Sequence, residues 1–214
     1  MRELTLTALA GLPEVAAGAS LPRLVLDAIK RNGKTLCAGD VLVIAQKIVS
    51  KAEGRRIRLA DVSPSARART LAAQAQKDPR LMELVLCEAR EVLRVKPGVV
   101  IVEHRLGFVM ANAGIDQSNL APGESESALL LPQDPDASAE RLREALMAAS
   151  GVELGVVVND SFGRAWRNGV TGVAIGVAGL PAPNDMRGRT ERAGRAPRVT
   201  EIAAADELAA AASL

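Results

Sequence analysis

Aromatic side chains are nearly absent from this chain, which has two Phe, one Trp and no Tyr among 214 residues. A surface for single-stranded nucleic acid needs aromatic side chains on which bases stack. An excess of one charge is lacking too, because 27 Lys and Arg face 25 Asp and Glu, for a net charge of +2. A nucleic-acid binder normally shows a clear basic excess. We therefore expect no nucleic-acid partner and a core of Ala, Val, Leu and Ile.

Long apolar runs and cysteine motifs are lacking as well. The longest apolar runs, such as Val99–Val102, are far too short to span a bilayer, and the N-terminus shows no signal-peptide pattern. Cys37 and Cys87 lie in no CxxC or Cys/His spacing, which predicts two reduced, buried thiols. The single histidine, His104, excludes a multi-His metal site. These absences predict a cytoplasmic protein with no membrane partner.

The chain is long enough to bury a core without disulfides, and apolar residues make up 48% of it. Strand-like and helix-like segments occur without the regular alternation of a doubly wound sheet. The pattern predicts an α+β fold with a mixed-sheet, two-layer architecture and helices. No GxxxxGK[ST] or GxGxxG follows a strand, so neither a P-loop nor a Rossmann fold is expected.

Apolar periodicity places the individual elements. Ser138 is the expected N-cap of the helix that starts there. Strands are expected at 3–9, 40–45, 99–103, 128–131, 154–158 and 170–179, and helices at 23–31, from 63–64 to 77–79, 80–93, 138–150 and 203–214. A polar loop is expected at 163–169.

Two loops deliver an acidic residue beside hydroxyl or amide neighbours. NAGIDQSN presents Asp116, Ser118 and Asn119, and VVVNDSFGRAWR presents Asp160 and Ser161 at the end of a strand. Mg²⁺ prefers carboxylate and hydroxyl oxygens, often with substrate phosphates completing the shell. Each Asp can equally cap a turn, which is common. The residues alone thus leave a metal site and two turn caps as alternatives.

Basic residues offer a phosphate contact. Lys47 and Lys51 lie four residues apart, on one face of a helix, where they can bind a phosphate or form a solvated basic face. Arg164 and Arg167 flank Trp166, a pattern that covers an anionic ligand or fills the edge of a core. His104 is either an acid/base group or a satisfied side chain near a strand end. The residues point to an α+β enzyme with an oxygen-ligand metal and phosphate site, but they define no substrate.

At these same residues the sequence resembles the coenzyme F420-0:gamma-glutamyl ligases. The blocks GLPEV, AQKIVSKAEGR, HRLGFVMANAGIDQSN and VVVNDSFGRAWRNGVTGVAIGVAGL occur in the family's order between residue 11 and about residue 180. The resemblance implies GTP-dependent addition of L-glutamate to coenzyme F420-0, at the lactyl-phosphate side of this deazaflavin precursor. It implies transfer of the GTP γ-phosphoryl group to the precursor's carboxylate and attack of glutamate on the acyl phosphate. Further γ-linked glutamates can then be added.

The resemblance also implies residue roles. Asp116 and Asp160 are expected to be catalytic and to hold a divalent metal (Mg²⁺ or Mn²⁺), with Ser161 as a ligand of a second ion; K⁺ is a further expected cofactor. From their own chemistry, rather than from the resemblance, Lys47, Arg164, Trp166 and Arg167 are expected to contact the substrate. Nucleotide contacts are expected from Leu12, Pro13, Glu14, Val15, Gln46, Lys51 and Asn119.

The expected domain organisation is a single ligase module over residues 1–214, in which two intertwined subdomains would divide near 112–135. Relatives continue beyond the alanine-rich helix in which this chain ends, so the family's C-terminal tail is expected to be missing. A homodimer is expected by resemblance alone. Three alternatives stay open: another nucleotide-dependent carboxylate–amine ligase, a non-catalytic GTP-binding homologue, and a metal-dependent hydrolase.

Overall fold

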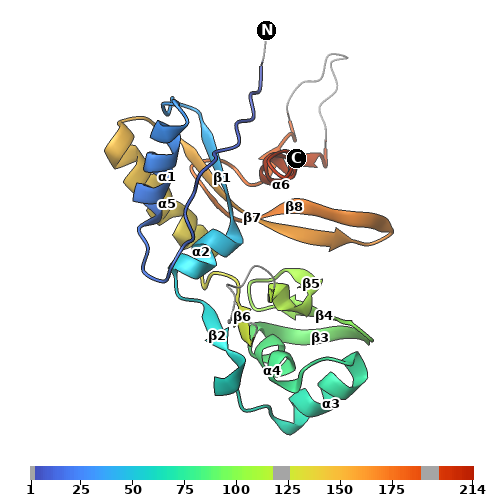
Figure 1. Cartoon of the computed structure of the whole chain (residues 1–214). Coiled ribbons are helices and arrows are strands. Elements are labelled where there is room, and N and C mark those ends of the chain that lie inside the picture. Colours follow the sequence, from blue (N-terminus) through green and yellow to red (C-terminus); the bar gives the residue numbers. More distant parts are fainter. Residues whose placement is uncertain (1–2, 118–125, 189–197) are drawn as a thin grey trace.

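The computed structural model describes residues 3–117, 126–188 and 198–214. Helices and strands are mixed along the chain, and the strands pair both in parallel and antiparallel, so the predicted α+β class with mixed sheets is confirmed. Figure 1 shows two lobes, one above the other, joined by the segments that enter β2 (Arg56–Arg58) and leave β6 (Ser127–Leu129). Among the described residues, no helix has both the length and the apolar character needed to cross a membrane.

The first lobe is built around a three-stranded sheet in the order β1-β7-β8. β1 runs parallel to β7, with Val41 opposite Gly155, and β8 runs antiparallel to β7. The elements of this lobe are α1 (Leu21–Arg31), β1 (Val41–Ala45), α2 (Gln46–Ala52), α5 (Pro135–Ser150), β7 (Gly155–Arg164), β8 (Arg167–Ala178), β9 (Asn184–Asp185), β10 (Glu201–Ile202) and α6 (Ala204–Ala211).

The second lobe is formed by the chain between α2 and α5. Its main sheet has the order β3-β4-β5 and is entirely antiparallel, and β2 pairs with β6 in a small ladder where the lobes meet. The elements are β2, η1 (Leu59–Asp61), α3 (Ala66–Ala75), α4 (Pro79–Glu88), β3 (Ala89–Lys96), β4 (Val99–His104), β5 (Val109–Ala111), η2 (Asn112–Gly114) and β6.

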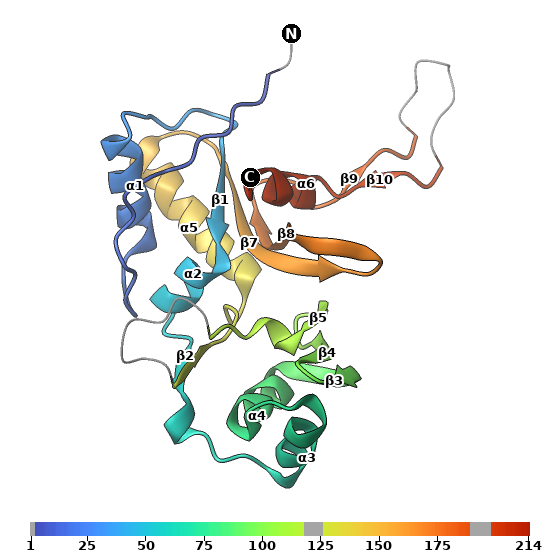
Figure 2. The ribbon, with the colours of Figure 1, turned by 45° about the vertical axis from the view of Figure 1, so that its right-hand side comes forward.

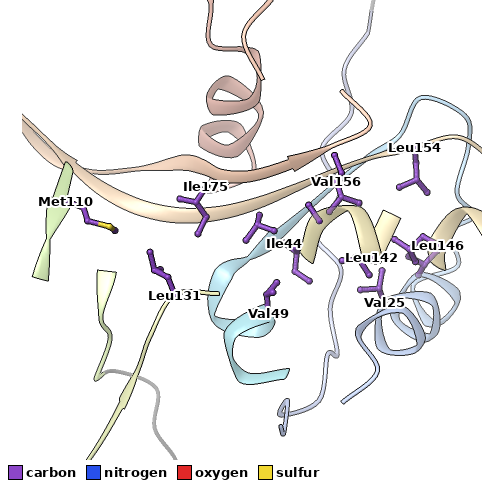
Figure 3. Packing of buried hydrophobic residues seen from close by; sticks show 14 residues of the cluster. Val25, Ile44, Val49, Met110, Leu131, Leu142, Leu146, Leu154, Val156 and Ile175 are labelled. Atoms are coloured by element: carbon purple, nitrogen blue, oxygen red, sulfur yellow. The ribbon is translucent and has the colours of Figure 1, made fainter. Parts of the chain in front are cut away.

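Each lobe has its own hydrophobic core. In the first, Val156 and Val158 of β7 are fully buried, and Figure 3 shows Val156 in the same cluster as Leu142 of α5 and Val25 of α1. The second core surrounds Met82, Val85 and Val100. Met110 of β5 belongs to the first core, so the two lobes are packed against one another. The division near 112–135 stays a prediction.

A long hairpin of β7 and β8 extends away from the body of the first lobe (Figure 2). The ladder continues to Gly163 opposite Val170 and Arg164 opposite Arg167, so Ala165 and Trp166 form the tip. The expected end of this strand at 158 and the loop at 163–169 were therefore wrong. Cross-strand hydrogen bonding keeps this polar sequence extended, a tertiary effect that apolar periodicity does not detect.

Several other local predictions were wrong. Residues 3–9 form no strand: no described strand pairs with them, and Leu4 and Leu6 are exposed. The helix expected over 80–93 ends at Glu88, where the chain becomes β3 and pairs with β4. The N-cap of α5 is Asp134, whose carboxylate accepts the Ala137 N–H at 2.9 Å, and not Ser138. Both thiols are unpaired as predicted, but they are exposed rather than buried.

Candidate functional site

A cleft of about 690 Å³ lies where the hairpin of the first lobe meets β5 of the second. Its polar lining includes residues that the sequence singled out from distant segments: Gln46, Lys47, Asp116, Asp160, Ser161 and Arg164. Its apolar lining includes Ile101, Val109, Ile115 and Phe162. The structure thus brings the two predicted carboxylates and one predicted lysine into a single cavity.

Asp116 reaches the cleft through a strained segment. Asn112, Ala113 and Gly114 adopt left-handed backbone conformations in succession, with φ of 51°, 53° and 66°. A Cβ on Gly114 would lie 2.7 Å from Met110 Cε, so only glycine fits there. Asp116 then exchanges both backbone hydrogen bonds with Leu129. Strained backbone of this kind persists only where the surrounding structure enforces it, often beside functional groups.

Asp160 belongs to β7 at the point where the hairpin leaves β1. Burial raises the pKa of its carboxyl, the charge of nearby Asp116 adds to this, and Lys47 and the Gln46 amide oppose it. Gln46 is 2% exposed, and its Oε1 accepts the Ser50 hydroxyl at 2.9 Å. Asp116 and Asp160 are thus close enough for each negative charge to disfavour the other. A cation bound beside them would stabilise the charged form of both carboxylates.

Lys47 and Lys51 of α2 contact different carboxylates. Lys47 Nζ forms an ion pair with Asp116 across the two lobes. Lys51 Nζ lies 2.5 Å from Glu14 Oε1, and its side chain is only 12% exposed, so it is not part of a solvated basic face. The hydrogen bond and charge of Lys51 lower the pKa of Glu14. Among Leu12, Pro13, Glu14 and Val15, only Val15 is buried.

The remaining predicted residues lie elsewhere. Trp166 and Arg167 are at the hairpin tip, beyond the lining of the cleft, and Trp166 is fully exposed. Asn119 and Ser118 fall outside the described residues. His104 is completely buried at the end of β4, where its Nδ1 accepts the Leu106 N–H at 3.1 Å. Its Nε2 lies 3.4 Å from Glu88 Oε2 without a hydrogen bond, so the side chain is only partly satisfied, and His104 does not line the cleft.

Sequence reasoning missed the apolar wall of the cleft. Phe108 and Phe162 meet edge to face, with ring centroids 6.0 Å apart, and this contact joins the second lobe to the hairpin. Two of the three aromatic residues in the chain thus form one contact.

The cleft fits a divalent cation. In the described part of the chain no three His, Cys, Asp or Glu side chains are grouped for a metal, so a cation there would have two carboxylates, Asp116 and Asp160. Ser161, the next residue of β7, also lines the cleft. One or two carboxylates with substrate phosphates is the usual protein environment of Mg²⁺. Fold and cleft together define an α+β protein with a two-lobed, carboxylate- and lysine-lined site.

Comparison with known proteins identifies the family. The model of the F420-0:Gamma-glutamyl ligase family matches residues 11–214, and the chain belongs to this family. The coenzyme F420:L-glutamate ligase of Methanothermobacter thermautotrophicus is 46% identical over 211 residues, covering 99% of this chain and 82% of that protein. The proteins of the same name from Methanopyrus kandleri and Archaeoglobus fulgidus are 48% and 42% identical, covering 82% and 95% of this chain and 69% and 78% of their own lengths.

Proposed function

We propose that this protein is a GTP-dependent ligase that joins L-glutamate to coenzyme F420-0. Membership of the family supports the reaction class, and relatives at 40–48% identity carry the name coenzyme F420:L-glutamate ligase. The observation that carries the mechanism is one cleft that holds two carboxylates and a lysine from different lobes. Transfer of a phosphoryl group depends mainly on positioning and charge neutralisation, and this lining supplies both.

The proposed reaction has two steps. An oxygen of the acceptor carboxylate attacks the γ-phosphorus of GTP, the bond to the β-phosphate oxygen breaks, and GDP leaves. The amine of L-glutamate then attacks the carbon of the acyl phosphate, inorganic phosphate leaves, and the nitrogen loses a proton as the amide forms. Neither step needs a nucleophilic side chain of the protein.

The residues of this chain would orient and neutralise these groups. Asp116, Asp160 and Ser161 would hold a divalent metal, which supplies charge neutralisation for the phosphates when bound. Lys47 would leave its ion pair with Asp116 and bind a phosphate oxygen of the nucleotide. Lys51 would likewise leave Glu14 and bind a phosphate oxygen. Leu12–Val15, Gln46 and Asn119 are proposed to contact the nucleotide, and K⁺ is a proposed further cofactor. A homodimer is proposed by resemblance alone.

A substrate-omission assay tests this proposal. Purified protein with GTP and Mn²⁺ is given coenzyme F420-0 and glutamate singly and together, and GDP is measured. Release that requires both co-substrates supports a ligase. Release without glutamate would indicate a hydrolase, and GTP binding without release a non-catalytic homologue. Release with other carboxylates but not with F420-0 would identify a different ligase.

A further inference from the structure

The hairpin tip carries an unusual set of exposed side chains. Trp166 is fully exposed and has φ of 55°, a left-handed conformation that is uncommon for a side-chain-bearing residue. It is the only Trp of the chain. Arg164 and Arg167 flank the tip as a cross-strand pair, and neither forms an ion pair within the described residues. An indole between two available guanidinium groups is suited to a planar, anionic ligand.

The cleft leads from the carboxylates toward this tip. Its lining follows β7 from Asp160 through Phe162 and Arg164 to Ala165. Arg164 is four residues further along the strand than Asp160, a span of about 13 Å at the usual rise of a strand. A ligand that lies along β7, from the carboxylate pair toward the hairpin tip, would therefore contact the carboxylates first, Arg164 next and Trp166 last.

Groups of the acceptor occur in the same order. In the proposed reaction its carboxylate must lie at Asp116 and Asp160, where phosphoryl transfer takes place. A phosphate follows along its side chain, and the planar deazaflavin ring lies at the far end. Arg164, which lines the cleft between the carboxylates and the tip, offers the anionic side chain a planar cation that suits phosphate oxygens. Trp166 meets the ring position with an exposed aromatic face.

We infer that the β7–β8 hairpin is the acceptor-binding arm of this ligase, with Arg164 holding the anionic side chain and Trp166 stacking on the fused ring. This inference rests on the proposed function, because it takes the acceptor from there. Arg167 adds positive charge at the same end. The arm would select an acceptor whose anionic group reaches Arg164 while its ring reaches Trp166. The nucleotide would bind elsewhere, at α2 and the N-terminal segment.

The composition of the chain supplies a direct probe. With one Trp and no Tyr, the intrinsic emission of the protein reports Trp166 alone. Titration of the wild-type protein with coenzyme F420-0 should quench this emission saturably, whereas GTP alone should leave it unchanged. Free N-acetyltryptophanamide at the same absorbance corrects for light absorbed by the ligand. Saturable quenching supports the arm, and its absence at concentrations that support turnover overturns it.

Steady-state kinetics separate this role from a structural one. Trp166→Ala should raise the KM for coenzyme F420-0 at least about fivefold, the low end of a lost aromatic stack, with the KM for GTP unchanged. Arg164→Ala should also raise the KM for coenzyme F420-0, and Arg164→Lys should raise it less because the positive charge is kept. Arg94→Ala, on an exposed position of β3 at the far edge of the second sheet, is the matched control and should leave both constants unchanged.

Other outcomes have defined meanings. If ligation proceeds and Trp166→Ala leaves the acceptor KM unchanged, the arm does not bind the acceptor, although the proposed function stands. If Trp166→Ala changes the oligomeric mass in light scattering rather than the acceptor KM, the tip contacts a second copy, and the inference is wrong. If coenzyme F420-0 quenches Trp166 but no glutamate is added, the arm is supported and the proposed ligase activity fails.

Discussion

Lys47 of α2 forms an ion pair with Asp116, although the two residues belong to different lobes and lie far apart in the sequence. Both residues line the cleft, and both interact electrostatically with Asp160. One cation thus balances two carboxylates, of which Asp160 already has a raised pKa through burial. A bound metal would neutralise part of the charge of Asp116 and Asp160, and Lys47 would then be released to bind a phosphate. Metal binding and phosphate binding in the cleft would therefore be coupled.

Replacement of Asp160 by Asn should abolish turnover and leave the fold intact. The substitution keeps the shape of the side chain and removes a partly desolvated charge, so the free energy of unfolding should not fall. Asp160 is one of the two carboxylates proposed to hold the metal that neutralises the phosphates, so its loss should lower kcat at least about 100-fold. GDP release and thermal unfolding measure the two effects. Asp27→Asn, on the exposed part of α1, is the control and should keep the normal rate. A normal rate for Asp160→Asn would remove it from the site.

Lys51→Ala should raise the KM for GTP by tenfold or more, because a charge-assisted contact of a mostly buried lysine is worth about 1.5–3 kcal/mol. The side chain is 12% exposed and contacts Glu14, so it is already held in position. Initial rates over a range of GTP concentrations measure the effect. The same substitution at Lys34, an exposed position after α1, should leave the constant unchanged. An unaltered GTP dependence would show that Lys51 does not contact the nucleotide.

Glu88 links the two lobes through a buried charge network. Arg55 Nη2 lies 2.9 Å from one of its carboxylate oxygens, and Arg105 Nε lies 3.0 Å from the other. The two guanidinium groups also donate to the carbonyls of Leu131 and Gln133, in the segment that returns to the first lobe. Burial alone would raise the pKa of Glu88, but His104, Arg55 and Arg105 lower it to about 2.

Acid should therefore weaken this protein through Glu88. Since its pKa is lowered from 4.5 to about 2 by folding, its contribution to stability is fully present above pH 4.5 and is lost as the pH falls toward 2. The shift corresponds to about 3 kcal/mol at neutral pH. Glu88→Gln should be destabilised at pH 7, and the difference from wild type should shrink below pH 4.5. Urea unfolding across this range measures it, and a difference independent of pH would contradict the account.

Gly176 of β8 should tolerate no side chain. A Cβ there would lie 2.4 Å from the carbonyl oxygen of Pro135, where α5 begins against the sheet. The same contact region includes a hydrogen bond from the Val177 N–H to Asp136 Oδ1 at 2.8 Å. Gly176→Ala should therefore lower the free energy of unfolding by about 1–3 kcal/mol. Gly163→Ala, with no atom within 4 Å of the added Cβ, is the comparison and should cost less.

Local patterns predicted the elements whose signal is local. The apolar runs at 41–45 and 155–158 form the paired strands β1, which is half-buried, and β7, which is buried there, and α1 ends at Arg31 as expected. The strand β3 could not be found, because its helix-like sequence is overruled by pairing with β4. The extension of β7 to Arg164 likewise depends on β8.

The candidate site was predicted as a set of residues rather than as a geometry. Asp116, Asp160 and Lys47 were selected by chemistry, and the resemblance to the ligase family supplied their roles. Their meeting in one cleft depends on the two crossings between lobes, which no local pattern encodes. The contact of Phe108 with Phe162 depends on the same long-range packing.

Mass spectrometry of the acceptor tests the central claim most directly. Coenzyme F420-0 is incubated with the protein, GTP, Mn²⁺ and L-glutamate, with each omitted in turn, and the mass of the deazaflavin product is measured. The account predicts an increase of one glutamyl residue, or of several in succession, only when every component is present, with one GDP formed per glutamate added. An unchanged acceptor mass in the complete mixture, while GTP binds or is hydrolysed, would contradict it.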